Sequence, residues 1–598
     1  MNVNILDYGA NGDGKSLNTE AFAAAVQACA RSGGGYVEVP AGAYLTGTVR
    51  LASNVFLRLA PGARVLGSPL LRDYEGPERG CAWDQRLGRI TGNPELNLCR
   101  ALILAEDAQD CGIVGPGTID GCRGGVPAPE AGRPMLVVFS RCRNVTLRDL
   151  TLTRPGMFCS YMLACRDVTI RGVRIESATT PCGDGLDFDG GENVTISDCL
   201  IDAGDDGISL KSLTPGEPCL RFTISNCVIR ARYWGAIRIG PESTAGARHI
   251  AVSNCVFRDC NDGLKIQLTE DAEFADFTFS NITMDRVVRP LFVTNTRYRF
   301  SSLSHGVRPP AGAMRRFSFC NINATLFRRE GEGWALPNCY LYALPGSVME
   351  DLTLSNLQLC CPGGGTAADA NRADHPEMLD FVEQYPESCL RMGSYPSAGL
   401  YIRNAQRICL DGVTVQCAEP DARCAVAAEA VDGLYLHRVR ARNCGGVLRH
   451  IACPGLQLLN CEGEVRPLSA AQAAQWQAAR SLAEGIDRRM AEIAALMDAL
   501  AERMPLEPLP AGGAALTFTA EEGTRYALVL PLVRGDFRVL VNGDEVARHR
   551  VPPAYATLTS FACELHDRAK PGLNRVELVT PEDGLPLELP EAGAIYAL

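Results

Sequence analysis

The sequence lacks a basic excess and a long apolar run, and each lack excludes a class of partner. Its 598 residues hold 58 Lys and Arg against 69 Asp and Glu, a net charge of -11. A phosphate-binding face needs a surplus of basic side chains, so we expect no nucleic-acid partner. No apolar run is long enough to span a bilayer, and we expect no membrane partner either.

The amino-terminal stretch MNVNILDYGANGDGKS has neither a basic region nor an apolar region of the kind that marks a secretion signal. We therefore predict a cytoplasmic protein, in which the 26 cysteines stay reduced. No cysteines show the paired spacing of zinc ligands. Several recur at strand positions, where a thiol acts as a small buried hydrophobe: Cys199, Cys227, Cys255 and Cys320.

A nine-residue pattern repeats through the middle of the chain. Strong copies begin at Asn144 (NVTLRDLTL), Asp167, Asn193, Arg221, His249 and Asp276, and weaker ones at Arg316, Asp351, Arg407, Gly433 and Gly455. Each copy alternates apolar and polar residues before a bend, which indicates a half-buried strand. The early spacing of about 23 to 28 residues is typical of stacked repeats. We predict an all-β chain whose residues 1–467 form a parallel β-solenoid of about a dozen coils.

Other segments flank this solenoid. Residues 18–30 predict a short capping helix. Residues 468–504 predict a long helical segment whose apolar positions follow heptads from Trp476 to Met504. That seam favours either a homo-oligomer through residues 476–504 or a helix lying on the solenoid flank. Residues 514–598 return to alternating strands and predict a small β-sandwich with a hairpin at Val541-Asn542-Gly543.

Five carboxyl groups crowd the stretch from Pro181 to Ser212: Asp184, Asp187, Asp189, Asp205 and Asp206. If the run between them is one coil, Asp184 and Asp205 lie on neighbouring rungs of the same face, roughly 4.8 Å apart. Like charges at such range raise one another's pKa, which favours acid–base chemistry or a bound cation. The alternative is that the Asp-Gly pairs are turn formers.

Further motifs give residues 1 to about 462 a family resemblance. They are DYGANGDG at Asp7, GPGTIDG at Gly115, YPE at Tyr385 and GLYIR at Gly399, with Cys182-Gly183-Asp184 and Asp205-Asp206 at matching separation. The chain resembles glycoside hydrolase family 28, the polygalacturonases. This resemblance implies a right-handed parallel β-helix and hydrolysis of a glycosidic bond with inversion.

The resemblance also implies roles for the carboxyl groups. Asp205 would be the general acid, while Asp184 and Asp206 would hold and deprotonate the attacking water. We predict that their neighbours Asp187 and Asp189 contact substrate. No metal and no organic cofactor would be required.

Two departures from the family pattern fall in the same site. Trp234 stands where the family has His, and Lys265-Ile266-Gln267 stands where it has Arg-Ile-Lys. Gln267 offers hydrogen bonds but no charge to a sugar carboxylate, while Trp234 offers a stacking face or simply fills the groove. Arg238 either replaces the missing cation or points outward into solvent. We expect all four side chains to bind substrate.

Three hypotheses for function follow. The first is a glycosidase acting on a pectin-related or other plant-type oligosaccharide, by inversion and from the chain end. The second is a carbohydrate-binding or structural β-helix without turnover, because the family His and Lys are missing. The third is a polysaccharide lyase or epimerase that uses a cation held by Asp184, Asp187 and Asp189.

Overall fold

A computed structural model describes most of the chain. The described residues are 2–78, 99–123, 133–296, 312–329, 336–372, 394–478, 481, 504–510, 513–522, 524, 526–533, 537–549, 559–565, 568–580 and 592–597. They fall into two compact units, one ending at Gln477 and one beginning at Ala478. Among these described residues there is no helix long and apolar enough to cross a membrane.

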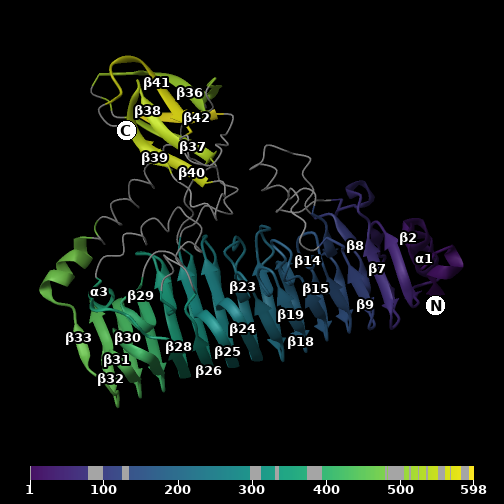
Figure 1. The fold of residues 1–598 in the computed structure, drawn as a ribbon, viewed down its shortest axis with the longest axis horizontal. Helices are drawn as coiled ribbons and strands as arrows, with labels where there is room; N and C mark the ends of the chain where they lie inside the picture. Colours follow the sequence, from purple (N-terminus) through teal and green to yellow (C-terminus); the bar gives the residue numbers. More distant parts are fainter. Residues whose placement is uncertain are drawn as a thin grey trace. The chain divides into compact units, whose positions relative to one another are not determined.

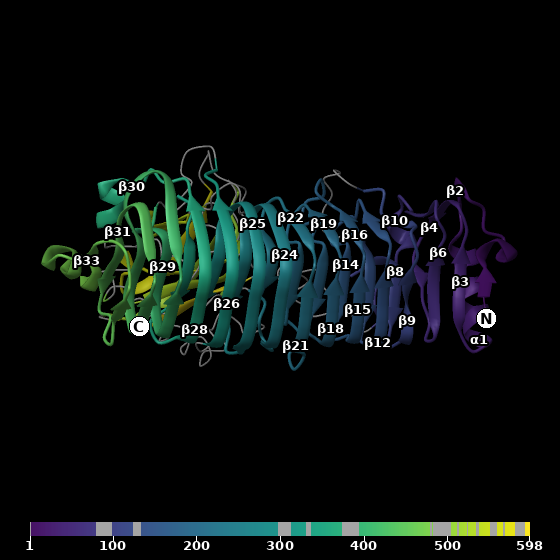
Figure 2. The same ribbon diagram turned by 90° about the horizontal axis from the view of Figure 1, so that it is seen from below.

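The first unit is a parallel β-helix built from three long sheets (Figures 1 and 2). Sheet 1 contains β5 (Val49–Arg50), β8 (Ala101–Glu106), β11 (Met135–Ser140), β14 (Ser160–Leu163), β17 (Leu186–Asp189), β20 (Ile208–Lys211), β23 (Gly235–Ile239), β27 (Cys339–Ala343) and β33 (Val465–Pro467). Sheet 2 contains β1 (Asn2–Asn4), β3 (Gly35–Val39), β6 (Val55–Leu59), β9 (Gln109–Val114), β12 (Arg143–Arg148), β15 (Arg166–Arg171), β18 (Gly191–Ser197), β21 (Cys219–Ser225) and β32 (Gln457–Leu459). Sheet 3 contains β2 (Asp13–Leu17), β4 (Gly42–Thr46), β7 (Ala63–Gly67), β10 (Thr118–Asp120), β13 (Thr151–Thr153), β16 (Arg174–Glu176), β19 (Leu200–Ala203) and β22 (Val228–Ala231). Longer strands bend from one sheet into another: β24 (Ala247–Leu268), β25 (Glu273–Asn295), β26 (Ala313–Leu326), β28 (Val348–Cys361), β29 (Ser397–Asp411), β30 (Thr414–His437) and β31 (Arg440–Ile451).

The sequence repeats stack in register in sheet 2. Val145 pairs with Val168, Val168 with Val194, and Val194 with Phe222, and each of these side chains is buried. The first residue of every repeat, from Asn144 to Gly455, has a positive φ between 50° and 69°. The turn before each strand therefore requires the left-handed region, which Asn, Asp and Gly tolerate best. The predicted solenoid and its repeat boundaries are confirmed.

Side-chain ladders reinforce this stack. At one turn, the amide of Asn281 donates to Asn254, that of Asn321 to Asn281 and that of Asn356 to Asn321, at 3.1, 2.9 and 2.8 Å. Inside, the rings of Phe277 and Phe317 stack with centroids 4.5 Å apart. Such repeated contacts link each coil to the next and to no other, as expected for a solenoid.

The cysteine prediction is correct for three residues and wrong for the fourth. Cys199, Cys227 and Cys255 are buried on successive rungs, and every described cysteine is a free thiol. Cys320 is only half-buried, because the register aligns it with Ser280. The position in line with Cys255 is occupied by Ile282 on the next rung.

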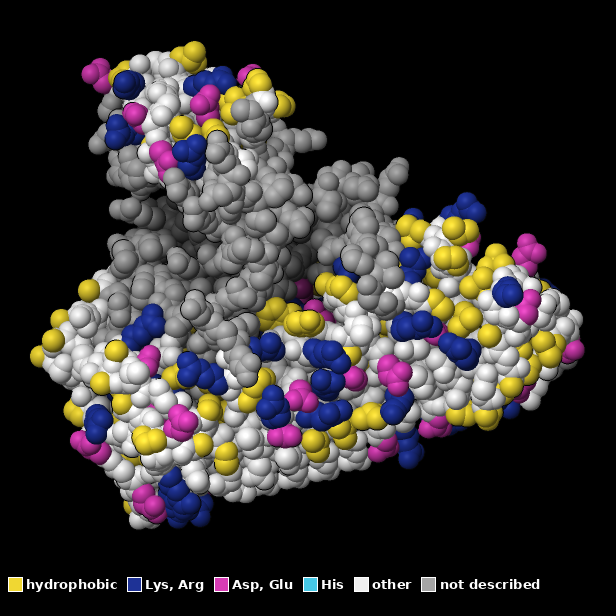
Figure 3. Space-filling model, viewed as in Figure 1, with side chains coloured by type: hydrophobic (Ala, Val, Ile, Leu, Met, Phe, Trp, Pro, Cys, Tyr) yellow, Lys and Arg dark blue, Asp and Glu magenta, His cyan; other side chains and the backbone are white. Residues whose placement is uncertain are grey.

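Oppositely charged side chains cover the outer turns of the β-helix. Arg171 lies 3.1 Å from Asp198, and Arg316 lies 2.6 Å from Asp276, in each case one rung away. Figure 3 shows Lys and Arg side chains interspersed with Asp and Glu over the displayed flank of this unit. The displayed flank therefore carries charges of both signs.

The helices are short. The predicted cap is present as α1 (Thr19–Arg31), which buries Phe22 and Val26 against the first coil, beside the 3-10 turn Ile5–Tyr8. A second 3-10 turn spans Leu71–Asp73, and α3 spans Ala367–Asn371. The long helical segment predicted for 468–504 is not supported: the described residues are helical at 470–478 and 481, and the others before Met504 lie outside the description. The predicted oligomer seam falls largely on those residues and stays a prediction.

The second unit consists of two antiparallel sheets. One contains β34 (Met504–Pro505), β37 (Tyr526–Val533), β40 (Thr559–Glu564) and β42 (Ala592–Ala597), and the other β35 (Glu507–Pro508), β36 (Ala514–Ala520), β38 (Phe537–Val541), β39 (Asp544–His549) and β41 (Gly572–Val579). Both sheets contribute to one apolar core that includes Leu528 and Val539. The hairpin expected at Asn542-Gly543 joins β38 to β39, with both residues at positive φ, as a two-residue hairpin turn requires. The described strands agree with the predicted sandwich.

The stacked phenylalanines give a stability prediction. Phe317→Ala removes a fully buried ring, and we expect it to lower the free energy of unfolding of the β-helix by about 3–5 kcal/mol. Ser318→Ala, one residue away on the outer face, is the matched control and should change it by less than about 0.5 kcal/mol. Chemical denaturation of both variants measures the difference, and equal effects would contradict the stacking order described here.

Candidate active site

The candidate site lies where three neighbouring strands of sheet 1 begin. Asp184 precedes β17 by two residues, Asp206 precedes β20 by two, and Gly235 is the first residue of β23. Since Leu186 pairs with Ile208 and Ile208 with Ile237, these three positions lie on successive rungs. The stacking continues through the backbone, because the N–H of Gly185 donates to the carbonyl of Asp206 at 2.9 Å.

This register corrects the predicted alignment of the carboxyl groups. Asp184 is in line with Asp206 and not with Asp205, because the paired strands are offset by 22 residues. Asp205 is instead in line with Trp234 on the next rung, by the register that pairs Ile208 with Ile237. Asp205 therefore lies one residue out of phase with the other two carboxyl groups.

The glycine after each aspartate is needed for close packing. A Cβ on Gly207 would lie 2.4 Å from the side chain of Ile229, and one on Gly185 would lie 2.3 Å from the carbonyl oxygen of Gly207. Neither glycine has a positive φ, whereas Gly190 does. Close packing thus explains the glycines of these Asp-Gly pairs. It does not explain why an aspartate precedes each glycine.

Asp206 is buried and held as a carboxylate. One oxygen accepts the N–H of Gly235 at 2.8 Å, and the other lies 2.6 Å from the guanidinium of Arg238. Burial alone would raise the pKa of Asp206, but the charges of Arg238 and Lys265 and the Gly235 N–H outweigh it and hold the pKa below its ordinary value. Asp206 is the ionised member of the doublet.

The pKa of its sequence neighbour Asp205 is shifted in the opposite direction. Asp205 is half-buried, and burial together with the adjacent charge of Asp206 raises its pKa to about 7. Two adjacent carboxyl groups therefore differ in protonation at neutral pH, which is the arrangement needed for one acid and one base.

Lys211 lies between two other carboxyl groups. Its Nζ is 2.5 Å from Asp187 and 3.5 Å from Asp184, and 4.3 Å from the centre of the Phe158 ring. Burial, followed by the charges of Asp187 and Asp205, raises the pKa of Asp184 well above its usual range. The ammonium group occupies the place that the lyase hypothesis gives to a metal cation. Within the described part of the chain, no three Asp, Glu, His or Cys side chains form a metal-binding group.

Asp189 is separate from this cluster. Its carboxylate accepts hydrogen bonds from the hydroxyl groups of Tyr161 at 3.0 Å and Thr214 at 2.8 Å, and from the N–H of Thr214 at 3.0 Å. It is fully buried, as is Asp187. The structure gives both carboxyl groups protein partners, while their predicted contact with substrate stays a prediction.

The other predicted substrate-binding residues lie on the next two strands of sheet 1, β23 and β24, or immediately before β23. Arg238 is buried and does not point into solvent, and besides Asp206 it contacts Glu242 at 3.3 Å. Trp234 is half-buried, and the Nζ of Lys265 lies 4.7 Å from the centre of its ring. Gln267 follows two residues later in β24 and is fully buried.

Sequence reasoning missed Lys211 and Glu242. The strand period of two was a usable signal for Lys211, because Ile208 and Leu210 are core residues and Lys211 must then point away from the core. For Glu242, which follows β23, no periodic signal exists. Its contact with Arg238 depends on how the chain bends after Gly240.

The polar residues form part of one outward column along sheet 1. In register, the column reads Leu104, Val138, Tyr161, Asp187, Ser209, Arg238, Lys265, Phe292, Tyr340 and Tyr401. On one side of the polar members, Tyr161 packs with Phe158 in a buried apolar cluster. On the other side, the ring of Tyr395 covers Tyr340 and Tyr401, with centroids 4.6 and 5.2 Å away.

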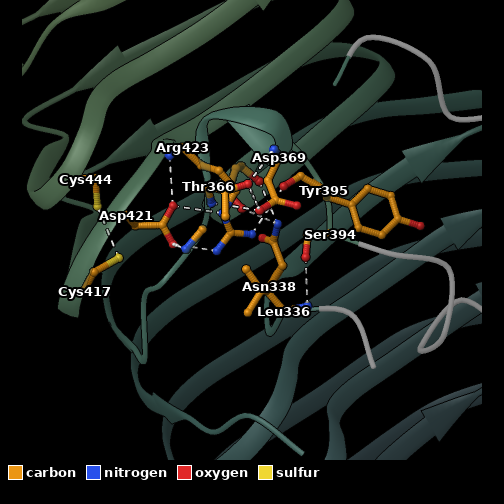
Figure 4. A network of polar contacts seen from close by, with 12 residues as sticks. Leu336, Asn338, Thr366, Asp369, Ser394, Tyr395, Cys417, Asp421, Arg423 and Cys444 are labelled. Atoms are coloured by element: carbon orange, nitrogen blue, oxygen red, sulfur yellow. Dashed lines mark hydrogen bonds and ion pairs between the residues drawn. The ribbon is translucent and has the colours of Figure 1, made fainter. Parts of the chain in front are cut away.

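A polar network fixes Tyr395 in this position (Figure 4). Arg423 donates to the carbonyl of Tyr395 at 3.3 Å and pairs with Asp421 at 2.7 Å. The N–H of Gly365 donates to Asp421 at 3.0 Å, which anchors the capping box of Thr366 and Asp369 at the start of α3. The polar patch of sheet 1 is thus bounded by apolar side chains on both sides.

The structure thus combines a parallel β-helix with a carboxyl doublet and a patch of paired charges. Residues 92–313 match the model of Glycosyl hydrolases family 28. A probable polygalacturonase of Vitis vinifera is 28% identical over 289 residues, covering 44% of this chain and 56% of that protein. The resemblance to the polygalacturonase family is confirmed over the matched residues.

Other relatives show the same likeness. The exo-poly-alpha-D-galacturonosidase of Dickeya chrysanthemi is 23% identical over 390 residues, covering 56% of this chain and 63% of that protein. The chain thus spans less than two thirds of the length of either curated relative. Among solved structures, a hyperthermoactive exopolygalacturonase from Thermotoga maritima has a TM-score of 0.48 and 19% identity, and the match covers 69% of this chain and 91% of that one.

The opposite pKa shifts of the doublet give opposite stability predictions. The pKa of Asp205 is higher in the folded protein than in the unfolded chain, so this group destabilises the fold as pH rises from about 4 to 7. We expect Asp205→Asn to stabilise the protein at pH 8, on the order of 2–4 kcal/mol, and to have little effect at pH 4.

Asp206→Asn is the matched control, with the sign reversed. The pKa of Asp206 is depressed by folding, so its stabilising contribution is present above the unfolded pKa and is lost as pH falls through the folded one. This variant should therefore be less stable than the unmodified protein at pH 8. Denaturation at both pH values measures each effect, and a shared sign at pH 8 would refute the assignment.

Proposed function

We propose that the protein is a glycoside hydrolase that cleaves a pectin-related or other plant-type oligosaccharide with inversion of configuration. The observation that carries this proposal is the doublet, in which Asp205 has a pKa near 7 and Asp206 is held ionised by Arg238. The family match and the polygalacturonase relatives support it.

The chemistry assigns one task to each carboxyl group. Asp205, protonated near neutral pH, donates its proton to the oxygen of the leaving sugar. Asp206, with Asp184 in line on the preceding rung, holds a water molecule and accepts its proton as the water attacks the anomeric carbon from the opposite face. Gly235 and Arg238 keep Asp206 ionised for that task.

We also propose that the enzyme acts at a chain end. Apolar side chains close the outward column of sheet 1 on both sides of the polar patch, through Phe158 and Tyr161 on one side and Tyr395 on the other. A short, bounded patch suits the terminal unit of an oligosaccharide better than the interior of a polymer. A cytoplasmic location, which suits trimming of short fragments, stays a prediction.

The role of Asp205 as general acid is tested by replacing it with a residue that cannot protonate the leaving group. Asp205→Asn should lower kcat by about 10²–10⁴-fold, the range that general acid catalysis supplies. Asp198→Asn, an exposed carboxyl group seven residues earlier on the same coil, should leave kcat unchanged. The rate is followed by chromatography of products from galacturonide, rhamnogalacturonide and neutral plant oligosaccharides. Undiminished turnover in Asp205→Asn would remove this residue as the acid.

The pH profile and the products test the rest of the proposal. We expect kcat/KM to fall on the alkaline side with a pKa near 7, as Asp205 loses its proton. Proton NMR during hydrolysis should show the product with inverted anomeric configuration, and the smallest product should accumulate from the first time point. Early release of mixed longer fragments would contradict action at the chain end. Sugar binding without any turnover would favour the binding-protein hypothesis.

A further inference from the structure

Gln267 and Thr294 are buried polar side chains on two neighbouring strands of sheet 1. Gln267 is fully buried and Thr294 nearly so, and they pair across neighbouring strands of sheet 1. Among the described residues, no hydrogen-bond partner exists for either amide atom of Gln267 or for the hydroxyl of Thr294. A buried amide with neither its donor nor its acceptor used is costly, and native proteins rarely retain one without a function.

Both side chains face the same side of sheet 1 as the acid–base doublet. Leu264, Ile266 and Leu268 belong to the hydrophobic core, so Lys265 and Gln267 between them point away from it. Lys265 is close enough for its charge to lower the pKa of both Asp205 and Asp206. Gln267 follows it by two residues, about 7 Å along the strand. The unused amide thus lies on the outward side of sheet 1, two residues beyond a lysine whose charge reaches both members of the doublet.

The cations nearby already balance protein carboxylates. Lys211 contacts Asp184 and Asp187. Arg238 contacts Asp206 and Glu242. With Lys265, three cations therefore face five carboxyl groups, before any substrate is present. A sugar carboxylate entering this patch would have to compete with these protein carboxyl groups for the same cations.

We infer that the sugar bound at Gln267 and Thr294 is a neutral pyranose, recognised through its hydroxyl groups, and not a uronic acid. The amide of Gln267 both donates and accepts, and so does the hydroxyl of Thr294, which matches the hydroxyl groups of a neutral sugar. Gln267 is thereby the specificity-determining residue. This inference rests on the proposed function for its reaction, but its recognition step is separately measurable.

The test measures binding in the Asp205→Asn variant, which mimics the protonated acid. Methyl glycosides of galactose, glucose, rhamnose, xylose and arabinose are titrated beside those of galacturonate and glucuronate, by ligand-observed NMR. We expect a neutral glycoside to bind at least about tenfold more tightly than either uronate. Tighter binding of a uronate, or no detectable binding of any neutral glycoside, would overturn the inference.

A positive charge introduced at one position sharpens the test. Gln267→Lys should shift the ratio of uronate to neutral affinity by about tenfold or more toward the uronate. Gln406→Lys adds the same charge at an exposed glutamine of sheet 2 and should leave the ratio unchanged. Thr294→Val, which keeps the shape and removes the hydroxyl, should weaken neutral binding about fivefold and carries the test if Gln267→Lys does not fold.

The outcome also separates this inference from the proposed hydrolysis. Neutral glycosides that bind to the unmodified protein without any turnover of their oligosaccharides would sink the hydrolase and support the inference. Turnover of galacturonides alone, abolished in Asp205→Asn, would support the hydrolase and sink the inference.

Discussion

Parallel in-register pairing of successive coils is the constraint on which the rest of the structure depends. Once Val145, Val168 and Val194 are stacked in sheet 2, the strands of sheet 1 are aligned as well, because the coils are continuous. That alignment sets Asp184, Asp206 and Gly235 on successive rungs. The side chains of a site thus come from segments more than 20 residues apart, while the backbone hydrogen bonds of the sheets hold them at a fixed spacing.

Charge pairing decides how the carboxyl groups differ. Asp205 and Asp206 are adjacent in the bend before β20, but their surroundings differ. Asp206 is turned toward Arg238 and the N–H of Gly235, which stabilise its charge, whereas Asp205 is held beside that charge without an equivalent partner. Burial strengthens both effects, since opposite and like charges act more strongly where water is excluded. The opposite pKa shifts of the two groups are a consequence of the fold.

The family resemblance bears on the reaction, whereas the unusual composition of the patch bears on the choice of substrate. The matched residues and the doublet support hydrolysis of a glycosidic bond. The paired cations, Gln267 and Thr294 support a neutral sugar at the site. The two proposals agree physically, since the proposed reaction uses the carboxyl doublet and the proposed choice of substrate uses side chains two and three rungs away.

The repeat pattern is enough to predict the solenoid, because each repeat carries its own alternating strand pattern and several repeats, such as those at Asn144 and Gly433, begin with a residue suited to positive φ. Their spacing of about one coil also predicts that Asp184, Asp187, Asp205 and Asp206 gather, but not that Asp189 lies apart from them. It did not determine the register within that coil, so Asp184 was assigned the wrong partner and Cys320 the wrong environment. Only the tertiary structure decided the partners of Arg238 and Lys211, because those contacts depend on turns and side-chain packing between rungs, for which local spacing carries no signal.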